Sequence, residues 1–316
     1  MTRVAVLDDY QSVALDMADW DSLPADVSVD AFSDHLSDED DVARRLEPYD
    51  VIVAMRERTP FQRSLLERLP NLRLLVTTGM RNASIDITAA HDNGITVCGT
   101  DGLPYPTAEL TWGLILALLR KIPTEDKATR QGSWQVTMGE GLQGKTLGVI
   151  GLGRLGSQVA SVGRAFGMNL IAWSQNLTAE RASEYGATLV TRADLLSQSD
   201  VVTIHLVLSA RTRGLIGAAE LSSMKPSAYL VNTSRGPIVD EPSLIDALKA
   251  GTIAGAGLDV FDVEPLPVDH PLRSLPNTVM TPHMGYVTSE TYRVFYRDAV
   301  EDISAFLKEN PIRVLS

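Results

Sequence analysis

The chain has a single cysteine, Cys98, among its 316 residues. One thiol excludes an internal disulfide and a metal site built from several thiolates. Basic side chains are also in the minority, because 28 Lys and Arg stand against 40 Asp and Glu, for a net charge of -12. This charge disfavours non-specific attraction to nucleic acid and to anionic membranes, so we expect neither as a partner.

Long apolar runs are absent too. The longest, around residues 114–119, is too short to cross a bilayer. The first apolar run soon reaches Asp8 and Asp9, unlike a signal peptide, so we expect a cytoplasmic protein. Cys98 follows apolar residues in a strand-like run, which favours a buried structural thiol. The length exceeds that of a usual single core and predicts two domains.

Short apolar runs alternate with helical or turn-rich segments, which predicts an α/β fold with largely parallel sheets. A broadly apolar helix is expected over 107–121, a polar arm or loop over 122–142, a helix over 289–308 and a closing strand over 312–315. The expected strands of the first set are 3–8, 51–54, 72–76 and 95–97, and those of the second set start at 146 and include 169–173, 187–190, 200–204, 228–231, 253–258 and 278–280.

Three glycines, Gly151, Gly153 and Gly156, follow the strand that starts at residue 146. In a G-x-G-x-x-G turn the first glycine makes the tight turn, the second lets a pyrophosphate approach, and the third lets the next helix pack on the strand. Glycine also marks ordinary turns, so the pattern alone is weak. The expected helix over 157–166 and strand over 169–173 complete a β-α-β unit, and this context favours a dinucleotide site.

Polar groups follow four later strands, at His205 and within 232–236, 259–265 and 281–283. Taken singly, Arg235 could be a surface charge, Glu264 a helix cap and His283 an ordinary loop histidine. Together, at the ligand edge of an α/β sheet, they suit hydride transfer between a nicotinamide and a 2-oxo or 2-hydroxy acid. Arg235 would bind the carboxylate, His283 would exchange the hydroxyl proton, and Glu264 would orient His283 and favour its charged form.

The chain resembles the D-isomer-specific 2-hydroxyacid dehydrogenase family over nearly its whole length. The motifs are GLGRLG at 151–156, VNTSRGPIVDEPSLIDAL at 231–248, GAGLDVFDVEP at 255–265 and TPHMGY at 281–286. The resemblance implies two doubly wound α/β domains, with a Rossmann cofactor domain (102–285) inserted into a flavodoxin-like substrate domain (1–101 and 286–316). It also implies a homodimer, in agreement with the apolar helix over 107–121.

The resemblance implies Arg235, Glu264 and His283 as the catalytic set, with NAD(H) or NADP(H) as cofactor and no metal. Asp259 matches the family's acid near the nicotinamide carboxamide. The implied cofactor-binding residues are Gly151, Gly153, Arg154, Leu155, Gly156, Ser174, Gln175, His205, Val207, Thr233, Ser234, Asp259 and Gly285.

On the substrate side, the family's carboxylate-binding loop falls on Thr78, Gly79, Met80 and Arg81, although its usual form has more glycine after Gly79. Arg81 could instead be a solvated loop charge. The segment from Arg56 to Arg58 resembles the loop that handles the distal end of the substrate in phosphoglycerate-type members, and a helix-start cluster of charges is the alternative.

Two departures concern the cofactor. Ser174 and Gln175 stand where NAD-preferring members usually carry an acid, and no arginine follows directly to attract a 2′-phosphate; Arg181 comes several residues later. The choice between NAD and NADP is therefore open. Val207 replaces a proline that is frequent in the family, so the loop that borders the nicotinamide ribose is expected to be less rigid.

The expected substrate is a small anionic 2-oxo or D-2-hydroxy acid of the glyoxylate or hydroxypyruvate type. Oxidation of 3-phosphoglycerate is the alternative; Arg56 and Arg58 favour it, while the length expected to follow the second domain leaves no room for a regulatory domain. A dinucleotide-sensing binding protein is the alternative of another class. Oxidation of formate or phosphite is a third hypothesis, which the same motifs allow but for which nothing in the sequence identifies a pocket.

Overall fold

The computed structural model describes residues 1–316 and divides them into two compact units. We call residues 1–103 and 287–316 the terminal unit, and residues 104–286 the central unit. Each unit is built on one parallel sheet, so the predicted α/β class is confirmed. None of the helices combines the length and the apolar character that a bilayer crossing requires.

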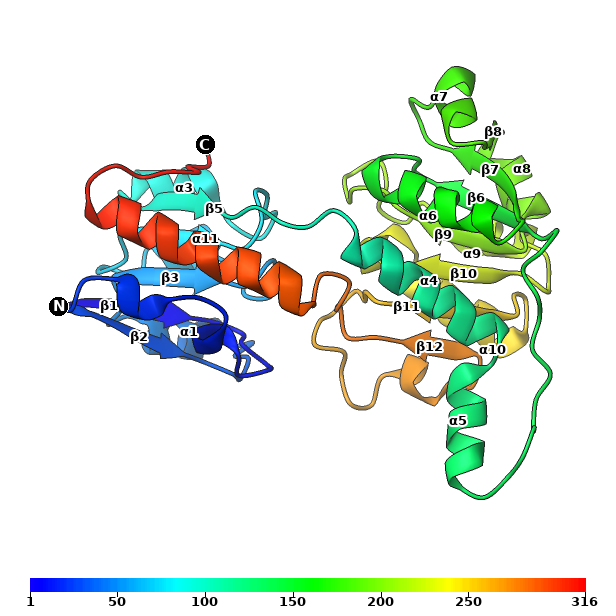
Figure 1. The fold of residues 1–316 in the computed structure, drawn as a ribbon, viewed down its shortest axis with the longest axis horizontal. Coiled ribbons are helices and arrows are strands. Elements are labelled where there is room, and N and C mark those ends of the chain that lie inside the picture. Colours follow the sequence, from blue (N-terminus) through cyan, green and yellow to red (C-terminus); the bar gives the residue numbers. More distant parts are fainter. The chain divides into compact units, whose positions relative to one another are not determined.

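The terminal unit has a five-stranded sheet in the order β2-β1-β3-β4-β5, as seen in Figure 1. Buried apolar side chains from β1, β3, β4 and β5 pack against α1, α2 and α3, and α11 packs against β4. Its elements are β1 (Thr2–Val6), β2 (Val27–Ala31), α1 (Glu39–Leu46), β3 (Val51–Ala54), α2 (Arg63–Leu66), β4 (Leu74–Thr77), α3 (Ile87–Asp92), β5 (Thr96–Gly99) and α11 (Ser289–Leu307).

The central unit has a seven-stranded parallel sheet in the order β12-β11-β10-β9-β6-β7-β8. Two separate apolar clusters pack on the sheet, one with α8, α9 and α10 and the other with α4 and α6. Helices α4 and α6 lie side by side in Figure 1. Its strands are β6 (Thr146–Ile150), β7 (Asn169–Trp173), β8 (Thr188–Leu189), β9 (Val201–Ile204), β10 (Tyr229–Asn232), β11 (Gly255–Leu258) and β12 (Thr278–Met280). Its helices are α4 (Pro106–Leu119), α5 (Ile122–Arg130), α6 (Arg154–Ala165), α7 (Ala179–Glu184), α8 (Arg192–Gln198), α9 (Ala218–Ser223) and α10 (Glu241–Ala250).

Two local predictions are wrong. Residues 122–130, expected within an arm or loop, form α5, because Pro123 stands in its first turn, Lys127 and Arg130 in its last, and no glycine interrupts it. Residues 312–315 do not form a strand. Val314 makes only an isolated antiparallel bridge to Cys98, because Arg313 has a left-handed φ of 51° that ends the extended geometry.

Cys98 lies in β5 with its side chain fully buried, as predicted. Burial raises the pKa of its thiol to about 12. The thiol is therefore protonated at neutral pH and acts as a small apolar side chain.

Candidate active site

The three glycines of the central unit differ in what surrounds them. Gly151 follows β6 with a left-handed φ of 96°, which a side chain rarely adopts. A methyl group at Gly156 would lie 2.1 Å from the carbonyl oxygen of Gly151, whereas one at Gly153 would meet no atom within 4 Å. Gly156 therefore serves packing, and Gly153, the N-cap of α6, leaves open space at a helix N-terminus. These features fit a dinucleotide pyrophosphate.

Four other predicted cofactor residues lie near this turn in the sequence. Arg154 opens α6 and is exposed, and Leu155 is half-buried. Ser174 and Gln175 follow the last residue of β7, and neither is buried. Arg181 forms an exposed ion pair with Glu184 on α7, which is the contact of an ordinary helix-surface charge.

His205 and Val207 follow β9. The Nε2 atom of His205 lies 2.9 Å from the Thr203 hydroxyl oxygen, while its buried Nδ1 has no hydrogen-bond partner. Burial lowers the pKa of His205 to about 4, so the ring is neutral at pH 7. The Val207 side chain is 77% exposed. The exposed apolar side chain of Val207 suits contact with a nucleoside, and the neutral His205 ring lies beside it in the chain.

Arg235 lies in a tight turn after β10. The Asn232 amide donates to the Arg235 carbonyl oxygen at 2.9 Å, and the Ser234 hydroxyl donates to the Ile204 carbonyl oxygen at 2.8 Å. A methyl group at Gly236 would lie 2.1 Å from the Phe261 carbonyl carbon, so this turn packs directly against the segment that carries Glu264. The Arg235 guanidinium is half-buried and donates to the Ser234 carbonyl oxygen at 2.7 Å.

Thr233, in the same turn, is fixed from another element. Its hydroxyl oxygen lies 2.8 Å from that of Thr111 on α4. The Thr111 hydroxyl donates to the Thr107 carbonyl oxygen, one turn earlier in α4.

His283 and Glu264 form a close pair in the central unit. The Nδ1 atom of His283 lies 2.5 Å from Glu264 Oε2, and Glu264 Oε1 accepts the Phe261 backbone N–H at 2.9 Å. The His283 and Glu264 side chains are 21% and 32% exposed, so solvent and a ligand can reach the pair. The carboxylate engages Nδ1 and leaves Nε2 as the nitrogen that can exchange a proton.

Asp259 holds the segment on which His283 lies. One carboxylate oxygen accepts the Thr281 hydroxyl at 2.6 Å and the Met284 N–H at 2.8 Å, and the other accepts the Gly285 N–H at 2.9 Å. Asp259 is buried, and desolvation raises the pKa of its carboxyl despite these donors. The sequence did not indicate that Asp259 fixes the turn on both sides of His283.

The predicted substrate residues all belong to the terminal unit. The Arg56 backbone N–H donates to the Thr78 hydroxyl at 2.8 Å, and its guanidinium donates to the Thr78 carbonyl oxygen at 2.9 Å. A methyl group at Gly79 would lie 1.9 Å from a guanidinium nitrogen of Arg56. The Arg58 guanidinium donates to the Asp8 carbonyl oxygen at 2.7 Å. Arg56 and Arg58 precede α2 by several residues and do not form the helix-start cluster that was the alternative.

Met80 and Arg81 form the exposed part of this loop, since Thr78, Gly79 and Asn82 are buried. The Asn82 amide donates to the Arg56 carbonyl oxygen at 2.6 Å and to the Thr77 hydroxyl at 2.9 Å. Sequence reasoning missed Asn82, because an asparagine in a loop is an ordinary turn residue until its burial is known.

Comparisons with known proteins agree with this arrangement. The profile of the D-isomer specific 2-hydroxyacid dehydrogenase NAD binding domain matches residues 112–285. A glyoxylate reductase of Aeropyrum pernix is 43% identical over 252 residues, which cover 77% of this chain and 75% of that protein. A D-3-phosphoglycerate dehydrogenase of Archaeoglobus fulgidus is 39% identical over 277 residues, which cover 87% of this chain but 52% of that protein, so this chain spans about half the length of that relative.

A solved structure of a phosphoglycerate oxidoreductase from Vibrio cholerae superposes with a TM-score of 0.93 at 36% identity, covering 98% of this chain and 100% of the other. The same fold is therefore shared over both units, and the predicted resemblance is confirmed. With a family profile matched over more than half of its length, the chain belongs to the D-isomer specific 2-hydroxyacid dehydrogenases, a family of NAD-dependent enzymes.

Proposed function

We propose that this dehydrogenase reduces a small 2-oxo acid, of the glyoxylate or hydroxypyruvate type, to the D-2-hydroxy acid. The observation that carries the proposal is the His283–Glu264 pair, which belongs to the same unit as the glycine turn and Arg235. The 43% identity to a glyoxylate reductase supports this substrate class.

Each member of the proposed catalytic set has one role. A bound nicotinamide supplies the hydride that substrate carbon C2 accepts. His283 donates a proton from Nε2 to the carbonyl oxygen, while Glu264 holds Nδ1 and so fixes the ring. Arg235 binds the substrate carboxylate through its planar fork and polarises the adjacent carbonyl. In the reverse direction His283 removes the proton of the hydroxyl group.

For the cofactor, we propose that the predicted central-unit residues bind NAD(H) or NADP(H). Gly153 and the start of α6 would hold the pyrophosphate, and His205 and Val207 would border the nicotinamide ribose. Ser174 and Gln175 neither repel nor attract a 2′-phosphate by charge. The predicted boundaries, 102–285 for the cofactor domain and 1–101 with 286–316 for the substrate domain, form part of the proposal.

The alternative substrate is 3-phosphoglycerate, which the 39% identity to a phosphoglycerate dehydrogenase supports. Arg56 and Arg58 would then bind the phosphate. Their guanidinium groups already donate to the carbonyl oxygens of Thr78 and Asp8. Because these hydrogen bonds compete with binding of a phosphate, they favour the smaller substrates.

We also propose that the enzyme is a homodimer formed through α4, α5 and the segment that follows, which projects from the central unit in Figure 1. Trp134 and Met138 in this segment are 78% and 89% exposed, and a second copy would cover them. Light scattering of the wild type and of Trp134→Ser tests this proposal. A monomeric wild type would contradict it.

The test of function is the loss of nicotinamide absorbance when NADH or NADPH is mixed with glyoxylate, hydroxypyruvate or pyruvate, and its gain when NAD is mixed with 3-phosphoglycerate. We expect turnover of at least one 2-oxo acid. Turnover of 3-phosphoglycerate alone, abolished by Arg56→Ala and Arg58→Ala, would establish the alternative. Binding of cofactor with no turnover of any acid would favour a sensor and contradict the proposal.

A further inference from the structure

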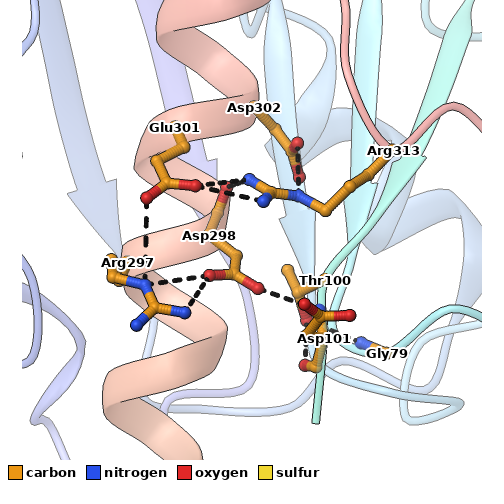
Figure 2. Close-up of polar contacts among 8 residues, drawn as sticks. All are labelled: Gly79, Thr100, Asp101, Arg297, Asp298, Glu301, Asp302 and Arg313. Carbon is orange, nitrogen blue, oxygen red and sulfur yellow. Dashed lines mark hydrogen bonds and ion pairs between the residues drawn. The ribbon is translucent and has the colours of Figure 1, made fainter.

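Thr100, just beyond β5, connects two loops of the terminal unit. Its fully buried hydroxyl accepts the Gly79 backbone N–H at 2.8 Å and donates to the Asp101 carbonyl oxygen at 3.0 Å. Its own N–H donates to the Thr77 carbonyl oxygen at 3.1 Å. A single side chain therefore fixes the turn at Gly79 through a contact distant in sequence, as Figure 2 shows.

The backbone at Gly79 needs this support. Its φ of 95° lies in the left-handed region, which glycine adopts readily but does not prefer over other conformations. The conformation of the turn must therefore be fixed by contacts. A methyl group at Gly99 would lie 2.9 Å from the Gly79 carbonyl oxygen, which shows how closely the end of β5 approaches the loop. Because the Gly79 N–H is buried and already paired, the exposed residues Met80 and Arg81 are the ones whose N–H groups remain for a ligand.

Asp298 on α11 binds the backbone of Asp101, the residue that follows Thr100. Its buried carboxylate accepts the Asp101 N–H at 2.9 Å, and its second oxygen accepts from the Arg297 guanidinium at 2.7 Å. Arg313 donates to the Asp298 carbonyl oxygen at 2.8 Å, and its own carbonyl oxygen accepts the Gly99 N–H at 3.0 Å. Figure 2 shows the network of Asp298, Asp101 and Thr100 that runs from α11 to Gly79.

We propose that Thr100 is a positioning residue for the substrate loop, supported from α11 by Asp298. The proposal rests on the proposed function and on the family resemblance, which places a second contact to the substrate carboxylate on the loop of residues 78–81. The Thr100 hydroxyl fixes Gly79, and the N–H groups of Met80 and Arg81 are thereby placed for the carboxylate. Thr100 does not touch the substrate, so its loss weakens binding of the acid and leaves proton transfer at His283 unchanged.

Valine and serine separate the hydroxyl from the shape of the side chain. Thr100→Val keeps the branched shape but leaves the Gly79 N–H unpaired, so the loop relaxes. We expect KM for the 2-oxo acid to rise about tenfold, with kcat within about twofold and the Kd for NADH unchanged, a loss equivalent to about 1.4 kcal/mol. Thr100→Ser keeps the hydroxyl and should restore KM to near the wild-type value.

Two α11 variants test the support. Asp298→Ala removes the acceptor for the Asp101 N–H and should raise KM in the same way as Thr100→Val. Glu290→Gln, the matched control, changes an exposed acid of α11 that accepts from the Ser289 hydroxyl and makes no contact with Asp101, Asp298 or Arg313, so it should leave KM unchanged. Thermal melting of each variant identifies any that fails to fold, and the Thr100→Ser comparison remains valid if Asp298→Ala does not fold.

An unchanged KM in folded Thr100→Val, or an equal rise in Thr100→Ser, would overturn the proposal. A lower KM would overturn it as well, because it would mean that the hydroxyl competes with the carboxylate for the Gly79 N–H. If the wild type turns over no acid, the proposed function has failed. The positioning role is then tested by binding instead of kinetics, through the Kd of oxamate, a non-reducible analogue of a 2-oxo acid, for the NADH complex. A tenfold weaker Kd in Thr100→Val then supports the positioning role, and an equal Kd refutes it.

Discussion

Alanine substitutions at Gly153 and Gly156 should separate cofactor binding from packing. The methyl group of Gly156→Ala would lie 2.1 Å from the Gly151 carbonyl oxygen, far inside an ordinary contact of about 3.5 Å, so the start of α6 must shift. Overpacking of this kind costs about 1–3 kcal/mol, of which the better helix propensity of alanine returns at most ~1 kcal/mol. At about 2–4 °C per kcal/mol for a unit of this size, Tm should fall by up to roughly 12 °C.

Gly153→Ala meets no atom within 4 Å, and the φ of -88° at this position suits alanine. Its stability should therefore change by less than ~1 kcal/mol, the difference between glycine and alanine at an N-cap. The methyl group would occupy the space where a pyrophosphate approaches, so the Kd for NADH should rise at least about tenfold, or ~1.4 kcal/mol.

Differential scanning calorimetry of the protein without cofactor measures the first effect, and NADH fluorescence titration measures the second. The reasoning is refuted if Gly153→Ala binds NADH as tightly as the wild type, or if it lowers Tm as much as Gly156→Ala does. A large Tm loss in both would mean that this turn serves packing alone.

Two further predictions concern charged side chains. Arg235→Lys should lower kcat/KM for the 2-oxo acid by about 100-fold, because an ammonium cannot form the planar fork, and steady-state kinetics that match the wild type would exclude the assigned role. Burial raises the pKa of Asp302 from 3.8 to about 7, because the folded state favours the protonated carboxyl. The contribution of this group to the free energy of unfolding is therefore fully present below pH 3.8 and is lost as the pH rises to about 7, a loss of at most about 4 kcal/mol. Urea unfolding at pH 5 and pH 8 should show this loss in the wild type and a flatter profile in Asp302→Asn; identical profiles would count against it.

The strands that position the site could be predicted because their apolar runs are uninterrupted. The expected ranges 51–54, 169–173 and 278–280 coincide with β3, β7 and β12. β2 was missed, since Val27–Ala31 carries Ser28 and Asp30 and none of its residues is fully buried. An edge strand that needs only one neighbour shows a weak pattern.

Side-chain contacts across long sequence separations could not be predicted. The sequence indicated Arg235, Glu264 and His283 through their positions after strands, and the close His283–Glu264 pair follows from where two neighbouring strands end. The bond between Asp101 and Asp298 joins residues 197 positions apart, and no local pattern marks either residue. The expected strand over 312–315 failed for a related reason, because the conformation of Arg313 is set by its contacts with Asp302 and Glu301 on α11.

The most direct test of the account is a comparison of His283→Ala with the wild type in NADH oxidation by glyoxylate and hydroxypyruvate. The account predicts that kcat falls by about 100-fold to 10,000-fold, the usual contribution of a general acid, while the Kd for NADH changes by less than about twofold. A kcat equal to that of the wild type would contradict the role of His283. Equal losses of kcat and of NADH affinity would show that His283 supports the cofactor site rather than proton transfer.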